Sequence, residues 1–295
     1  MAGATLPGRF ERWSRNVEEH TGTRTRAMDL YCGNSWSVVR RISASDDLGP
    51  KVRLWIVSAG LGLVTPKTMV PPYSATFAVG EPDSVVRQGN QEDVLRWWRL
   101  LVAWRKSKGP GVGSIADIAR GHPSEPLIAA LSDDYLSALR EDLAQARGLL
   151  VNAASLVIIS AGAKKDGELA ENFLPCDSRL EHRFGRSRMA LNTRVLEAFL
   201  NQHLRDGRTI ESVREHYADL LGSLPPAGYP VRERGSDDRV RSFIRARLAK
   251  DPGGRHTSLL RLYRWQGLAC EQSRFRELFR EVAAAVLIRK DRRAL

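Results

Sequence analysis

Cysteine and histidine are scarce in this chain of 295 residues. The three cysteines, Cys32, Cys176 and Cys270, lie far apart and lack the paired spacing of zinc ligands. The six histidines form no HExxH motif and no close pair. We therefore expect no disulfide framework, no metal and no cofactor. The low cysteine content favours a reducing compartment, and we predict a cytoplasmic protein.

Long apolar runs and nucleotide-binding loops are also missing. No apolar run approaches the ~20 residues that cross a membrane. Residues 1–7 lack the charged and apolar regions of a secretory signal. The chain contains neither GxxxxGK[ST] nor GxGxxG, and Ser58 and Ser160 lack the G-x-S-x-G context of a hydrolase nucleophile. These absences argue against a membrane or secreted protein, a P-loop or dinucleotide enzyme, and a serine hydrolase.

Positive charge is what the chain has in excess, with a formal net charge of +12. Residues 231–295 carry 17 Lys and Arg against 8 Asp and Glu, so most of the excess lies in this short region. Lysines and arginines that neutralise phosphates release counterions, which makes a polyanion the natural partner. We predict DNA, in double-stranded form, as that partner, and no membrane. A solvated basic surface without a partner is the alternative.

Two strand-like runs end in the same tripeptide. Residues 52–57 lead into Ser-Ala-Gly at 58–60, and residues 156–159 lead into Ser-Ala-Gly at 160–162. Apolar, β-branched runs that stop at small residues are typical of buried strands at the rim of a sheet. The serine offers a hydroxyl, while alanine and glycine leave room for a ligand near the backbone. The pattern predicts a ligand cleft at the strand ends; two unrelated strands with ordinary turns are the alternative.

Strand-like and helix-like segments alternate before residue 222, which predicts an α/β fold with a central, mostly parallel sheet flanked by helices. A loop is expected over residues 60–76, which are rich in glycine, proline and threonine. Helices are expected over about 10–19, 36–43, 91–106, 114–119, 133–147, 189–203 and 210–221, and a further strand over 126–131.

A proline-rich linker at residues 225–230 separates two expected domains. Residues 1–222 form the α/β catalytic domain, and residues 223–295 form a basic helical region. That region contains three helical patterns, 238–250, 257–265 and 271–287. The short turn around Gly267 between the last two favours a helix-turn-helix arrangement, with a plain helical bundle as the alternative.

Several short motifs stand in a recognisable order. Residues 58–77, SAGLGLVTPKTMVPPYSATF, combine a strand end, an SAG-x-GL turn and a Pro-Tyr-x-x-Thr loop. A Tyr-x-Gly-x-x-aromatic segment precedes them at 31–36, and segments 174–179 and 185–192 follow. In this order the motifs resemble the YaaA-like peroxide-stress proteins and related domains found beside DNA-modification and phage-defence genes. The resemblance covers roughly residues 28–205.

The resemblance implies a fold like that of uracil-DNA glycosylases, and DNA binding. One phage-defence branch of this group excises bulky glucosylated hydroxymethylcytosine. The implied function is therefore a DNA glycosylase that flips and excises a modified base in antiviral defence. A non-catalytic protein that recognises modified bases in DNA is the alternative. An enzyme acting on free nucleosides or nucleotides would leave the basic C-terminal region unexplained.

Base excision requires a flipped nucleotide, an aromatic surface and a stabilised, oxocarbenium-like sugar beside a water molecule. We expect Asp177 to position the water or balance the sugar's charge, and Asn34 and Asn192 to read the base or its leaving group. Alternatively, Asp177 caps a turn and Asn192 only bridges, while Tyr73 and Trp36 only pack. The expected substrate-binding residues are Ser58, Tyr73, Trp36, Ser160 and Arg186, and the expected DNA-binding residues are Arg255, Arg261, Arg264, Arg274 and Arg276.

Overall fold

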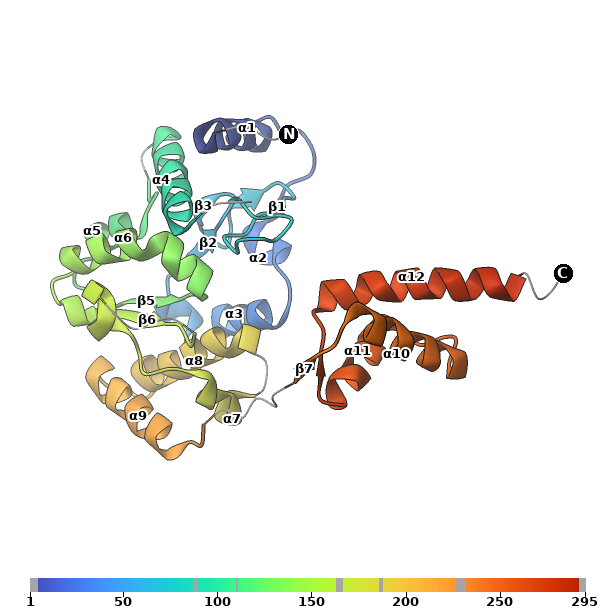
Figure 1. Ribbon diagram of the computed structural model, residues 1–295. Coiled ribbons are helices and arrows are strands. Elements are labelled where there is room, and N and C mark those ends of the chain that lie inside the picture. Colours follow the sequence, from blue (N-terminus) through green and yellow to red (C-terminus); the bar gives the residue numbers. More distant parts are fainter. Residues whose placement is uncertain are drawn as a thin grey trace. The chain divides into compact units, whose positions relative to one another are not determined.

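The structure is a computed structural model that describes residues 5–86, 90–109, 111–162, 167–185, 188–226 and 232–291, with side chains up to residue 285. The chain divides into two compact units, residues 1–227 and residues 228–295 (Figure 1). The sequence predicted the division after residue 222, and most of the predicted linker at 225–230 lies outside the described residues. Each unit is described by itself below.

The N-terminal unit mixes helices with short strands, and helices predominate. Its described strands form pairs, and no hydrogen-bonded ladder joins these pairs into one central sheet. The pairs are β1 (Thr25–Arg26) with β4 (Met69–Val70) and β2 (Ile56–Ser58) with β3 (Gly62–Val64), both antiparallel, and β5 (Leu127–Ala130) with β6 (Leu156–Ile159), which is parallel. The α/β class is therefore confirmed in the coarse sense that helices and strands are mixed.

A βαβ unit lies between the two cores of the N-terminal unit. β5 and β6 run in parallel, and α6 (Asp133–Leu149) crosses between them, as a parallel pair requires. The register pairs Ala130 with Ile159, so the carboxyl ends of both strands are level. Beyond β6, the backbone N–H of Leu174 donates to the carbonyl of Ile158 at 2.8 Å, which continues the pairing on the other side.

Alternate side chains of a strand point to opposite faces, and helices pack on both faces of β6. Leu156 and Ile158 pack in one core with α4 (Gln91–Ser107), α6 and α1 (Leu6–Glu18). Val157 and Ile159 pack in a second core with α3 (Asn34–Ala44), α8 (Leu191–Leu200) and α9 (Ile210–Ser223). Shorter elements are α2 (Ala27–Leu30), α5 (Ile115–Gly121), α7 (Glu181–Phe184), a π-helical turn (Asn201–Arg205), and 3-10 turns at Gly49–Lys51, Ala153–Ser155, Gly167–Asn172, Ser178–Leu180 and Arg188–Ala190.

The loop predicted for residues 60–76 contains two strands instead. Ser58 pairs with Gly62, so β2 and β3 form a tight hairpin and the first Ser-Ala-Gly lies at its turn. Gly62 has φ +73°, a left-handed conformation that favours glycine. The composition concealed this hairpin, because β3 is only three residues long and its flanking glycine, threonine and proline are typical of loops.

The C-terminal unit contains α10 (Asp237–Lys250), α11 (His256–Trp265) and α12 (Gln272–Asp291) among its described residues. These helices confirm the three predicted helical patterns. The turn between α11 and α12 includes β8 (Leu268–Ala269), which pairs in parallel with β7 (Glu233–Arg234). A separate core holds the unit together and includes the fully buried Tyr263, Phe275 and Leu278. Across the described parts of both units, no helix combines the length and apolar character needed to cross a membrane.

Candidate functional site

The carboxyl ends of β2, β5 and β6 meet at one end of the N-terminal unit. An ion pair between Arg53 and Glu125 joins the residues that precede β2 and β5. At the carboxyl ends of β2 and β5, Tyr135 in the first turn of α6 lies beside the backbone N–H of Ala59, the residue that follows β2. Burial raises the pKa of Tyr135 to about 12, and this N–H opposes part of the rise. The two Ser-Ala-Gly tripeptides are therefore neighbours across the start of α6.

The first tripeptide is held by an internal hydroxyl cluster. Ser58 is buried, and its Oγ accepts the backbone N–H groups of Gly60 at 3.1 Å and Leu61 at 3.0 Å. The hydroxyl of Tyr73 lies 2.6 Å from the same Oγ and also hydrogen-bonds the hydroxyl of Tyr31. Burial raises the pKa of Tyr73 well above its usual range, so this hydroxyl stays protonated. Ser58 and Tyr73 thus stabilise the hairpin turn.

Aromatic rings fill the space that the sequence assigned to a ligand at Gly60. A Cβ atom at this position would lie 2.7 Å from Cζ2 of Trp13 and 2.8 Å from Cε2 of Tyr73. The indole of Trp13 also donates to the Gly60 carbonyl at 2.7 Å. Trp36 stacks on Tyr31 with ring centroids 4.5 Å apart. The predicted opening at the first tripeptide is therefore wrong, and the structure shows Trp36 and Tyr73 in packing contacts.

The second tripeptide faces a carboxylate. The buried Ser160 donates from Oγ to Oδ1 of Asp133 at 3.1 Å. A Cβ atom at Gly162 would lie only 2.6 Å from Oδ2 of Asp133, so the glycine makes room for this carboxylate. Asp133 is nevertheless exposed. Its position in the first turn of α6 is one where the helix dipole stabilises a negative charge. A fixed carboxylate that solvent reaches thus lies at the ends of β5 and β6.

Asn192 joins the same two strand ends. Its Nδ2 donates to the carbonyl of Leu131 at 2.7 Å, and its Oδ1 accepts the N–H of Ala161 at 3.0 Å. Nearby, Ser35 at the start of α3 donates from Oγ to the carbonyl of Met189, just before α8. The neighbouring Asn34 is exposed, and its side chain makes no hydrogen bond with any described residue. The starts of α3 and α8 therefore flank the strand ends.

Asp177 is engaged with its own turn. It accepts the backbone N–H of Arg179 at 2.8 Å and pairs with the same guanidinium at 2.7 Å, which raises the pKa of Arg179. No hydrogen bond or ion pair within the described ranges joins Asp177 to Ser160 or Asn192. The structure thus brings Ser160 and Asn192 together around Asp133, while Asp177 lies in a separate ion pair. Arg186 lies outside the described residues.

Asp133 is the residue that sequence reasoning missed. The sequence placed it only as the start of a helix. The available signal was its position, since it follows one predicted strand while Ser160 follows the next. Parallel neighbours bring two such positions to the same edge. Among the described residues, no cluster of three histidine, cysteine, aspartate or glutamate side chains forms a metal site.

The arginines expected to bind DNA in the C-terminal unit fall into two groups. Arg255, Arg261 and Arg276 are exposed and make no side-chain hydrogen bond within the described part of the chain. Arg264 donates to the carbonyl of Cys270 at 3.0 Å. Arg274 pairs with two carboxylates, those of Asp237 and Glu277, and these hydrogen bonds raise its pKa.

An exposed apolar pair lies beside Arg261 on α11. Trp265 is 89% exposed and Leu262 is 37% exposed, one turn apart on the face that carries Arg261.

No family model, curated protein or solved structure matches the chain. The resemblance to YaaA-like proteins therefore stays a prediction, and the site itself is the basis for a functional proposal.

Proposed function

We propose that the protein is a DNA glycosylase that flips a modified base out of the duplex and excises it. The observation that carries this proposal is the exposed carboxylate of Asp133, held by Ser160 and fitted against Gly162. Cleavage of a glycosidic bond passes through an oxocarbenium-like transition state, and carboxylates stabilise that charge or activate water. Asp133 takes this role in place of Asp177.

The location of Asp133 supports a substrate site. In open α/β sheets, ligands bind outside the carboxyl ends of the strands. We propose that β2, β5 and β6 act together as the floor of such a sheet, because their carboxyl ends converge and helices cover both faces of β6. Asn192 then acts as a positioning residue that keeps the two strand ends together. Asn34, exposed at the start of α3, is available to read the flipped base.

The C-terminal unit supplies the grip on DNA in this proposal. The guanidinium groups of Arg255, Arg261 and Arg276 are exposed and have no hydrogen-bond partner among the described residues, and such groups bind backbone phosphates without regard to sequence. Trp265 gives the same unit an exposed aromatic surface on which a base can stack. Phosphate contacts position the duplex, so the N-terminal unit is left to recognise the modified base.

Recognition of a modified base without excision is the second candidate. Two side chains to which the sequence assigned roles in chemistry or binding are engaged inside the protein. Asp177 is paired with Arg179, and the hydroxyl of Tyr73 is hydrogen-bonded to Ser58 and Tyr31. A protein of this second kind would bind modified DNA and release no base.

Incubation of the full chain with defined duplexes separates the two candidates. Each duplex carries cytosine, 5-hydroxymethylcytosine or its glucosylated form at one position. We expect mass spectrometry to detect the released modified base and alkaline cleavage to reveal the matching abasic site. Binding without either product would favour the recognition protein. Failure to bind any of the three duplexes would contradict both candidates.

A further inference from the structure

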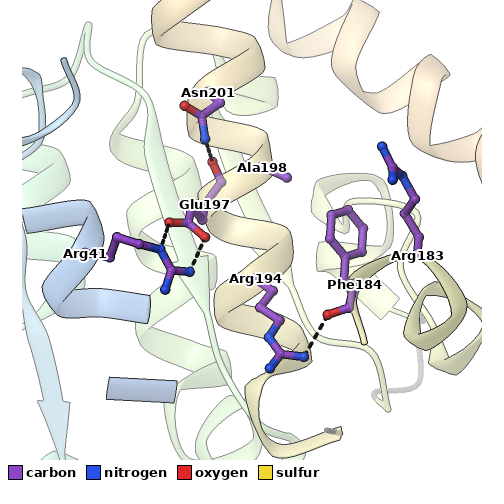
Figure 2. A pocket seen from close by; sticks show the side chains of 7 residues that line it. All are labelled: Arg41, Arg183, Phe184, Arg194, Glu197, Ala198 and Asn201. Carbon is purple, nitrogen blue, oxygen red and sulfur yellow. Dashed lines mark hydrogen bonds and ion pairs between the residues drawn. The ribbon is translucent and has the colours of Figure 1, made fainter. Parts of the chain in front are cut away.

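The surface of the N-terminal unit is hollowed along α3, α7 and α8, away from the residues of the strand-end site. The hollow has a volume of about 370 Å³. Three arginines from these three helices contribute to its wall, together with one aromatic ring and a single acidic side chain. The residues that line it are Arg41, Arg183, Phe184, Arg194, Glu197, Ala198 and Asn201 (Figure 2).

The charges of this hollow do not cancel. Arg41 forms two hydrogen bonds of 2.6 Å with the carboxylate of Glu197, and these raise the pKa of Arg41. The negative charge of Glu197 balances the positive charge of Arg41. Arg194 uses Nη1 to donate to the carbonyl of Phe184 at 2.7 Å and has no carboxylate partner among the described residues. Arg183 is exposed and makes no hydrogen bond or ion pair within the described ranges. Two positive charges therefore remain.

The arrangement leaves guanidinium groups directed at the hollow from more than one side. Figure 2 shows Arg41 and Glu197 on one side, Phe184 and Arg183 on the other, and Arg194 between them. The planar fork of a guanidinium matches the geometry of a phosphate and binds it through paired hydrogen bonds. An arginine-lined hollow therefore favours an anion over an apolar ligand.

We infer that this hollow binds a backbone phosphate of the DNA strand whose nucleotide enters the strand-end site. This inference rests on the proposed function. The starts of α3 and α8 flank that site, and the same two helices carry Arg41 and Arg194 to the hollow. From Asn34 to Arg41, helix α3 advances about 10 Å at 1.5 Å per residue. A DNA strand covers that length in about three nucleotides at 3.4 Å each.

Two variants that change the charge of the hollow in opposite directions test the inference in the full chain. Arg183→Ala removes a free positive charge, while Glu197→Gln removes the negative charge and releases Arg41. Arg12→Ala is the matched control, because Arg12 is exposed on α1 and forms no side-chain hydrogen bond or ion pair with a described residue, and α1 lies far from α7 (Figure 1). Arg41 and Glu197 form a partly exposed pair, which contributes little to folding. Thermal melting verifies that each variant is folded.

Fluorescence anisotropy of a labelled duplex, measured against salt concentration, gives the readout. Arg183→Ala should weaken binding several-fold and lower the slope of log affinity against log salt by about 0.9. Glu197→Gln should tighten binding, and Arg12→Ala should weaken it less than Arg183→Ala. Equal losses for Arg183→Ala and Arg12→Ala, without tighter binding by Glu197→Gln, would overturn the inference.

Two further measurements distinguish the source of the phosphate and the underlying function. If Arg183→Ala alters the affinity for a deoxynucleoside monophosphate but leaves duplex binding unchanged, the hollow takes free nucleotides and the DNA assignment is overturned. Base release is followed in parallel. If the wild-type chain binds the duplex with the expected variant effects but releases no base, the hollow is supported and the glycosylase proposal is what fails.

Discussion

Tyr217 is fully buried and Tyr73 is half-buried, and their hydroxyl groups differ in hydrogen bonding. The hydroxyl of Tyr73 bonds Ser58 and Tyr31, whereas that of Tyr217 has no partner among the described residues. Burial raises the pKa of both groups above their usual range. A buried polar group without a partner costs free energy, and a paired one contributes to stability. The two positions therefore differ in what a phenylalanine would do.

Replacing each tyrosine by phenylalanine should shift stability in opposite directions. Tyr217→Phe should raise the free energy of unfolding by about 1 kcal/mol, because it removes an unpaired buried hydroxyl. Tyr73→Phe should lower it by about 1–2 kcal/mol, because Ser58 and Tyr31 lose a partner. Urea unfolding followed by circular dichroism measures both. Destabilisation of similar size in the two variants would contradict this description of the hydroxyl cluster.

At the scale of elements, the glycine of the first tripeptide tests how the hairpin turn is packed. Gly60→Ala places a methyl group against the rings of Trp13 and Tyr73, which should destabilise the hairpin by about 1–3 kcal/mol. A Cβ atom at Gly148, near the end of α6, would meet open space, so Gly148→Ala is the control and should be neutral or stabilising. Equal stability of the Gly60→Ala and Gly148→Ala variants in urea would show that the turn is not packed as described.

The helices were the most predictable elements. The sequence placed α4, α6 and α10 within about two residues of their observed ends, because amphipathic periodicity and capping residues are local signals. The tryptophan pair on α4 was less predictable. Trp97 and Trp98 point in different directions, but both are buried, because the helix contacts Ala59 of the hairpin on one side and α6 on the other.

The candidate site was predictable in outline and not in detail. Periodicity indicated that both tripeptides follow strands, and Ser160 with Asn192 do lie together. What fills the space beside each glycine depends on contacts distant in sequence. Trp13 covers Gly60 and Asp133 covers Gly162, and no local pattern encodes either contact. The sequence indicated Asp177, which stands beside motif residues, and placed Asp133 only at the start of a helix.

At the scale of the whole molecule, the proposed chemistry belongs to the N-terminal unit, while most of the excess positive charge belongs to the C-terminal unit. The N-terminal unit has its own cores, and the C-terminal unit has a separate one. Residues 1–227 alone should therefore fold, as a cooperative urea transition would show. Without Arg255, Arg261 and Arg276, the slope of log affinity for DNA against log salt should fall by about 2–3, at about 0.9 per phosphate contact. An unchanged slope would contradict a DNA-binding role for the C-terminal unit.

The central claim concerns the carboxylate at the strand ends, and one comparison tests it most directly. The single-turnover rate of base release is measured for the wild type, Asp133→Asn and Asp177→Asn on the same glucosylated duplex. Asparagine at 133 keeps an oxygen that accepts from Ser160, so the site retains its shape. Asp133→Asn should bind the duplex at least as tightly and release base about 100-fold more slowly, while Asp177→Asn stays near the wild-type rate. An unimpaired Asp133→Asn beside an inactive Asp177→Asn would contradict the account.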